Sequence, residues 1–155
     1  MQLNYKHMFE SFPENSQVWI YSSTRFFTNE EEVFITTNLD QFIRQWATHG
    51  TDLFANATIL HHSFIVIVAD ENKVKSSGCS IDSSVRFIKD LGKELNIDFF
   101  NRMSILLKKE DEYKRIHFSD LSNHLEYEMF NPMVKTLKDL REKFILPVSE
   151  SELIR

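Results

Sequence analysis

The sequence predicts an α+β fold. The expected architecture is a ferredoxin-like βαββαβ unit, with one antiparallel sheet and helices on one face, plus a C-terminal strand and helices. Two observations lead to this prediction. β-forming and amphipathic helical segments follow one another in the order β-α-β-β-α-β. The run Phe-Ile-Val-Ile-Val-Ala at 64–69 is apolar at every position, as in a strand that is buried on both faces.

We expect a single domain over residues 1–155, because this length suits one ordinary domain. Residues 1–14 have no clean hydrophobic period and are predicted to form an N-terminal arm. Residues 17–108 are predicted to form the ferredoxin-like core, and residues 113–148 the C-terminal extension.

The first half of the predicted core begins with a β-forming run at 17–22. Thr28 and Glu31 have capping-box spacing. The apolar residues after them lie on one helix face: Ile35, Leu39, Phe42 and Trp46. Gly50 is expected to end this helix. Strands are predicted at 57–61 and 64–69, with a turn at His62-Ser63.

The second half begins with another predicted helix, because apolar residues again recur on one face: Ile81, Val85, Ile88, Leu91 and Leu95. Strands are predicted at 103–107 and 113–118, with a charged turn between them. Ser119 is expected to cap a short helix. Asn131 and Pro132 are expected to start a last helix, which must stop before Pro147.

Composition excludes several classes of function. The net charge is −5 and the densest basic stretch, at 108–115, is interrupted by acids, so we expect no nucleic-acid partner. The longest apolar run has six residues, whereas a membrane helix needs about 20, so no membrane association is expected. One unpaired cysteine and no signal-peptide pattern predict a cytoplasmic protein.

No cofactor or metal is predicted from the motifs. The three glycines do not form G-x-x-x-x-G-K-[ST], so the sequence has no Walker A loop for nucleotide phosphates. C-x-x-C and H-x-x-x-H are also missing, and His61 and His62 are expected on opposite faces of a strand.

The segment at 76–86 differs from ordinary scaffolding, because five serines, a glycine and the cysteine come directly before a predicted helix. Backbone N–H groups at a helix N-terminus favour an anion. The candidate ligand-binding residues are Ser77, Gly78, Ser80, Asp82, Ser83 and Arg86. The plainer interpretation is an N-terminal cap, in which Ser80 or Asp82 only ends the helix.

The same segment supports a chemical alternative. A helix N-terminus stabilises a thiolate, so Cys79 is a candidate nucleophile or redox-sensitive thiol. A thiol enzyme also needs a base, and the candidates are His49, His61, His62, His117 and His124. His49 is the most attractive of them because it lies at the end of the first predicted helix. No sequence spacing connects any of these histidines to Cys79, so whether the chain is an enzyme stays open.

Several motifs resemble a family of small uncharacterised bacterial proteins. They are Trp-Ala-x-His-Gly at 46–50, Ser-Gly-Cys-Ser-Ile-Asp-Ser-Ser at 77–84, Phe-Asn at 130–131 and Leu-Pro at 146–147. The resemblance covers residues 19–147. Members are sometimes labelled as transporter ATPases, and the missing Walker A loop speaks against that activity here. The serine-tryptophan ending of the family is also missing.

Three hypotheses follow. The first is a small binding module whose loop at 77–84 holds a small anionic ligand or a protein partner. The second is a thiol-dependent enzyme or redox sensor that uses Cys79. The third is a structural or interaction protein that forms a homodimer through an open sheet edge.

Overall fold

Two antiparallel sheets organise the chain. The computed structural model describes residues 7–48, 51–52, 54–70 and 78–154. The first sheet and its helices comprise β1 (Gln17–Ser22), α1 (Asn29–Gln45), β4 (Ala55–Leu60), β5 (Phe64–Ala69) and α2 (Gly78–Leu95). Two short strands, β2 (Ala47–Thr48) and β3 (Thr51–Asp52), pair between α1 and β4. The α+β class is confirmed.

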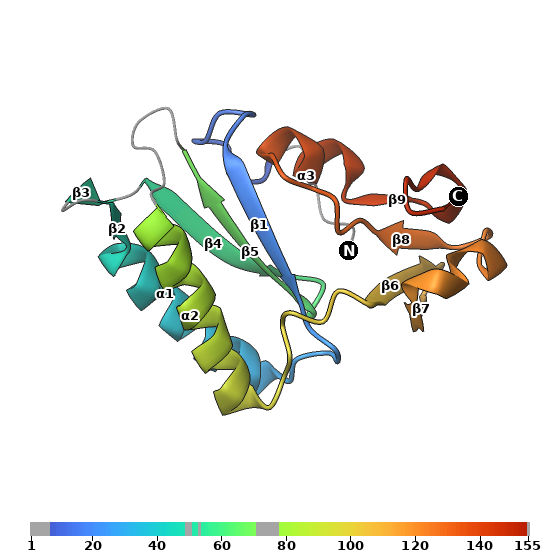
Figure 1. Cartoon of the computed structure of the whole chain (residues 1–155), viewed down its shortest axis with the longest axis horizontal. Coiled ribbons are helices and arrows are strands. Elements are labelled where there is room, and N and C mark those ends of the chain that lie inside the picture. Colours follow the sequence, from blue (N-terminus) through green and yellow to red (C-terminus); the bar gives the residue numbers. More distant parts are fainter. Residues whose placement is uncertain (1–6, 49–50, 53, 71–77, 155) are drawn as a thin grey trace.

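The second half of the chain builds the other sheet. Its elements are β6 (Ser104–Lys109), β7 (Glu112–His117), the 3-10 helix η2 (Phe118–Asn123), β8 (Glu128–Phe130), α3 (Leu137–Lys143), β9 (Ile145–Pro147) and the 3-10 helix η3 (Val148–Glu150). The strand orders are β1-β5-β4 and β7-β6-β8-β9. In Figure 1, α1 and α2 lie together on one side of the first sheet, and the second sheet lies on the other side of β1.

The complete ferredoxin-like order is not confirmed. β1, β5 and β4 are adjacent as that fold requires, but β6, the predicted fourth strand of the 17–108 core, pairs with β7 and β8 in the second sheet. Part of the free edge of β1 is taken by the segment before α3, where Gln17 pairs with Thr136 and Val18 N–H donates to Lys135 O at 2.9 Å.

Strand β5 is central, as its apolar run predicts. All six residues are buried, and its two faces belong to different hydrophobic clusters. Ile65 and Ile67 pack toward α1 and α2, together with Ile35, Leu39 and Ile88. The opposite face contributes to a second cluster: Phe64, Val66 and Val68, with Phe130, Leu137, Leu140 and Phe144.

Other predicted boundaries need correction. The capping box of Thr28 and Glu31 is confirmed, but α1 ends at Gln45, and Trp46 is already extended, so Gly50 does not end it. The last helix starts after the N-cap Thr136, not at Asn131. His117, not Ser119, caps the short helix after β7. The N-terminal arm packs from residue 8 onward, with Phe12 buried.

Helix α2 ends in a Schellman motif. Asn96 has a φ of 56°, and Ile97 N–H donates back to Gly92 O at 2.9 Å. No helix among the described residues combines the length and the apolar character that crossing a membrane requires.

Candidate anion-binding site

The turn between β4 and β5 has an unusual backbone conformation. His61 and His62 have φ values of 52° and 54°, and Ser63 N–H donates to Leu60 O at 3.1 Å. Positive φ at both central positions is the requirement of a type I′ hairpin turn, and histidine tolerates this region better than most residues. The turn is therefore centred one residue earlier than the sequence predicts.

This turn holds the loop between β1 and α1. Ser23 N–H donates to Ser63 O, and Phe27 N–H donates to His62 O, both at 2.7 Å. The two hydrogen bonds fix the residues between them against the turn. Phe26 belongs to this fixed segment, and its side chain is 45% exposed.

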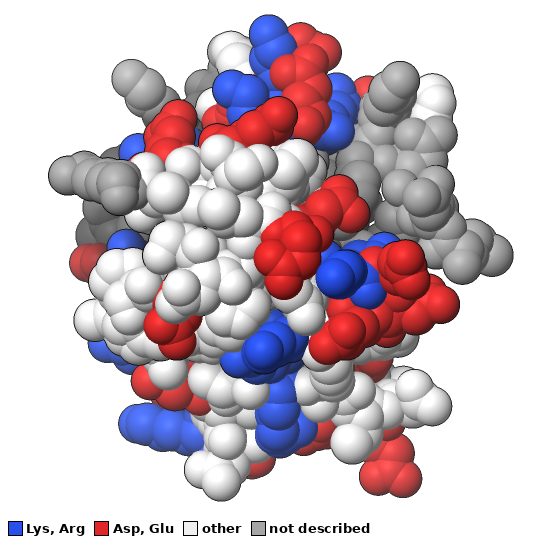
Figure 2. All heavy atoms as spheres, turned by 90° about the vertical axis from the view of Figure 1, so that its right-hand side faces the viewer, with Lys and Arg blue, Asp and Glu red and all other residues white. Residues whose placement is uncertain are grey.

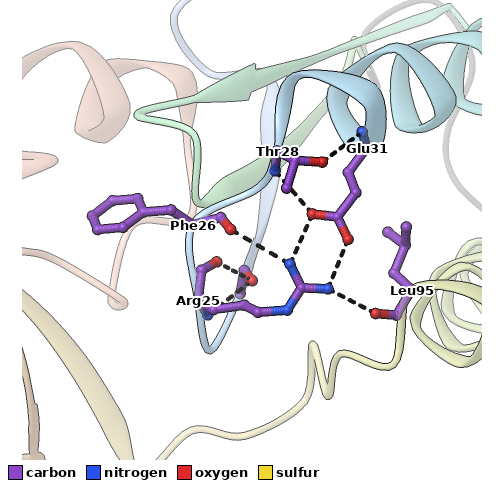
Figure 3. A network of polar contacts seen from close by, with 6 residues as sticks. Arg25, Phe26, Thr28, Glu31 and Leu95 are labelled. Carbon is purple, nitrogen blue, oxygen red and sulfur yellow. Dashed lines mark hydrogen bonds and ion pairs between the residues drawn. The ribbon is translucent and has the colours of Figure 1, made fainter.

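Arg25 holds the same loop from the other side (Figure 3). Its guanidinium donates to both carboxylate oxygens of Glu31 at 2.7 Å and to Leu95 O at 2.8 Å. The hydrogen bond from Arg25 is the main reason why the pKa of Glu31 falls to about 2. Arg25 thus joins the start of α1 to the end of α2, and the ring of Phe26 points away from this pair.

Arg115 on β7 reaches the turn from the second sheet. Its Nη2 donates to the Oγ of Ser63 at 2.6 Å, and Ser63 is fully buried. The Cζ of Arg115 lies 5.1 Å from the centre of the Phe26 ring, within the range of a cation–π contact. Burial lowers the pKa of Arg115, but a guanidinium still carries its charge at neutral pH.

Lys108 lies on the same face of the second sheet. The β6–β7 register sets Lys108 opposite Tyr113 and Leu106 opposite Arg115, so Lys108 and Arg115 are diagonal neighbours. The Nζ of Lys108 lies 6.0 Å from the centre of the Tyr113 ring. The two cations therefore lie beside two exposed aromatic rings, because Phe26 and Tyr113 contact each other edge-to-face at 5.6 Å.

The two histidines of the turn have different surroundings. His61 is half-buried, and its ring packs edge-on against Phe130 at 4.6 Å. Burial, with the nearby charge of Lys108, lowers the pKa of His61 to about 4, so this ring is neutral at pH 7. His62 is exposed and already contacts a carboxylate, because its Nδ1 lies 2.6 Å from Glu32 Oε2.

Neither Lys108 nor Arg115 has a carboxylate within 4.0 Å in the described part of the chain. The ion pairs found there join His7 to Glu10, Arg25 to Glu31, and His62 to Glu32. Arg115 is therefore a partly desolvated cation that is anchored by a neutral hydroxyl. A buried charge favours a partner of opposite sign, so this arrangement is suited to accept an anion.

The predicted site at 77–84 is described only in part. Helix α2 begins at Gly78, so Gly78, Cys79 and Ser80 belong to its first turn, and their side chains lie outside the described residues. Ser77 also lies outside them. Ser80 and Asp82 are inside the helix, which corrects their predicted role as N-cap.

The other predicted ligand-binding residues of this helix, Asp82, Ser83 and Arg86, are exposed. The neighbouring Ser84 is buried; its hydroxyl donates to Ile81 O at 2.7 Å, and its side chain also hydrogen-bonds Tyr21 on β1.

The predicted pairing of Cys79 with a histidine has no support in the described residues. His49 lies outside them. The turn with His61 and His62 lies at the start of β5, whereas the chain continues toward α2 from the other end of that strand (Figure 1). Six strand residues span roughly 20 Å, so these two histidines are remote from the start of α2.

A metal centre also lacks support in the described residues. They contain no group of three or more His, Cys, Asp or Glu side chains that could hold an ion.

Comparison with known proteins gives no information about the ligand or the activity. The chain matches no known family, no curated protein and no solved structure. The resemblance to the bacterial family therefore stays a prediction.

Proposed function

We propose that the protein is a non-enzymatic binding module for a small anionic ligand, and that Arg115 and Lys108 contact the anion. The observation that carries this proposal is the state of Arg115: half-buried, charged, anchored on Ser63 Oγ and without a described carboxylate in reach. An incoming phosphate or carboxylate supplies the missing negative charge and accepts charge-assisted hydrogen bonds.

The surrounding surface favours a small ligand over a polymer. Figure 2 shows the side of the molecule that carries the second sheet, where basic and acidic residues are interspersed around a broad uncharged area. A nucleic acid requires clustered basic charge to replace its counterions. A local pair of cations on a chain of net charge −5 suits one anionic group.

The first prediction tests this assignment with inorganic phosphate. We expect Arg115→Gln to weaken phosphate binding about tenfold or more, because hydrogen bonds to charged groups contribute about 1.5–3 kcal/mol. Binding is followed by NMR titration of the folded protein. The matched control is Lys114→Gln, which removes the same charge from the neighbouring, exposed position of β7. Equal affinities of the two variants contradict the proposal.

The segment at 77–84 that the sequence singles out remains part of the proposal as a second contact for an anion or partner, and Cys79 remains the basis of the thiol alternative.

The second prediction distinguishes an ordinary thiol from an activated one. If the start of α2 stabilises the thiolate, alkylation of native Cys79 follows a titration below the free-thiol pKa of about 8.5. A midpoint at or above that value removes the thiol enzyme from consideration.

A homodimer is the second candidate function, and the edge of β4 favours it. β4 (Ala55–Leu60) is a six-residue edge strand without charge, proline or glycine. The other edges of the two larger sheets are protected: β1 is bridged by the segment before α3, β7 carries charged residues, and β9 has three residues including Pro147. On β4, Ala57 N–H donates to Asn56 Oδ1 at 2.8 Å, so pairing would use the remaining backbone groups.

The third prediction tests this edge. If two copies pair through β4, Thr58→Lys converts the dimer to monomer in sedimentation velocity, because like charges meet across the twofold axis. Thr37→Lys, on the exposed face of α1, makes the same chemical change away from the edge and leaves the dimer intact. If the wild-type protein sediments as a monomer at every protein concentration tested, the homodimer proposal is rejected.

The finer fold assignment and the location belong to the same proposal. The connectivity β1-α1-β4-β5-α2 and the strand order β1-β5-β4 support a ferredoxin-like relationship for this part of the chain. A bacterial, cytoplasmic protein is what the sequence motifs and the unpaired cysteine predict.

A further inference from the structure

The charge available at the site limits the anion that it can hold. Lys108 and Arg115 are the two cations on this face of β6 and β7, and the exposed Glu128 of β8 lies opposite Lys108. His61 is neutral at pH 7, and the ring of His62 lies against the Glu32 carboxylate. A phosphate monoester has three strong acceptor oxygens, so it can accept hydrogen bonds from both cations at once, where a carboxylate has only two oxygens.

The same site presents an apolar surface. Phe26 is 45% exposed and Tyr113 is 40% exposed, although both are large aromatic residues. Their rings meet edge-to-face at 5.6 Å, and Tyr113 lies nearly parallel to Phe130, with an interplanar angle of 17° at 6.5 Å. Adjacent exposed rings form a surface on which a planar apolar group gains by stacking and by removing water.

Cations and rings are held in one arrangement. Arg115 lies over Phe26, Lys108 lies over Tyr113, and the segment with Phe26 is tied to the turn by backbone hydrogen bonds on both sides. A ligand that contacts the cations therefore has an aromatic surface directly beside it. Such preorganisation reduces the entropy that binding must lose.

From this juxtaposition we infer that the ligand is an aryl phosphate, a phosphate monoester on a planar aromatic ring, with the phosphate at Arg115 and Lys108 and the ring against Phe26 and Tyr113. This inference rests on the proposed anion-binding function and specifies its ligand class. It involves no covalent step.

The test compares phenyl phosphate with methyl phosphate by calorimetric titration at pH 7.5. The two probes share the phosphate monoester and differ in the ring. Stacking of one planar ring on an aromatic side chain raises the binding affinity by about fivefold or more. We therefore expect phenyl phosphate to bind at least about fivefold more tightly than methyl phosphate.

Variants locate the ring. The double variant Phe26→Leu with Tyr113→Leu keeps apolar bulk and removes both aromatic rings. We expect the ratio of the affinities for phenyl phosphate and methyl phosphate to fall toward one, while methyl phosphate still binds. Phe118→Leu is the matched control, because Phe118 is a similarly exposed phenylalanine, 39% exposed, that stacks on His117 outside the site. We expect it to keep the preference.

Each outcome separates the two proposals. Equal binding of both phosphates overturns the aryl-phosphate inference and leaves the anion-binding function in place. A preference that the Phe26 and Tyr113 variant retains also overturns it, because the ring then binds elsewhere. If neither phosphate binds the folded wild-type protein, the proposed function fails together with the inference.

Discussion

Replacing Ile67 by Ala is expected to lower the free energy of unfolding by about 2–5 kcal/mol. Ile67 is fully buried at the centre of β5, between its strand partners Trp19 on β1 and Ala57 on β4. Its side chain belongs to the cluster under α1 and α2, so the cavity cannot close without moving packed helices. Denaturant unfolding measures the loss.

The matched control for this variant is Ile81→Ala. Ile81 is 38% exposed on the first turns of α2, so the same substitution removes little buried surface and should cost much less. A loss below about 1 kcal/mol at Ile67 would show that β5 is peripheral, against the described sheet order.

Gly92→Ala is expected to destabilise the protein by about 1–3 kcal/mol, the typical cost of forcing an extra methyl group into a packed region. Helix propensity alone predicts a gain of about 1 kcal/mol, since glycine is a poor helix former. The structure instead predicts a loss of stability. A Cβ at Gly92 would lie 2.5 Å from Ile97 O, a backbone atom fixed by the Schellman motif.

The measurement for this variant is the unfolding midpoint and its denaturant dependence. The control is Asp90→Ala, at an exposed position of the same helix, where the substitution adds no atom against a packed backbone. A stabilised Gly92→Ala protein would mean that the carbonyl of Ile97 moves freely, so α2 would not end as described.

Local patterns predicted the first part of the fold well. The capping box of Thr28 and Glu31, the apolar stripe of α1 and the continuous apolar run of β5 each reflect contacts within one element or one sheet. The apolar stripes and strands of the sequence also predict nine core residues, of which six are buried and three are half-buried. The buried ones are Leu39, Trp46, Ile65, Ile67, Ile88 and Ile105, and the half-buried ones are Trp19, Phe42 and Val85.

The second sheet could not be predicted in the same way. β8 and β9 have three residues each, too few for a recognisable period. Their pairing depends on tertiary packing: Met129 lies opposite Leu107 on β6 and Leu146 on β9, and it is fully buried. The place of β6 follows from these partners, which come after it in the chain.

The proposed anion site was missed for a related reason. Mixed charges such as those at 108–115 are typical of a solvated hairpin tip. Strand alternation already sets Lys108, Tyr113 and Arg115 on one face of the predicted hairpin. The sequence does not show that this face contacts the turn at His61 and Ser63. That turn is some 50 residues away along the chain, so the contact exists only after folding.

The most direct test of the anion site is a map of backbone amide chemical shifts during titration with inorganic phosphate. We expect the largest changes, at saturation, in residues 61–63, 108 and 113–115, with smaller changes elsewhere. Changes confined to the start of α2, at 78–84, would assign the anion to the site predicted from sequence and contradict the role of Arg115 and Lys108.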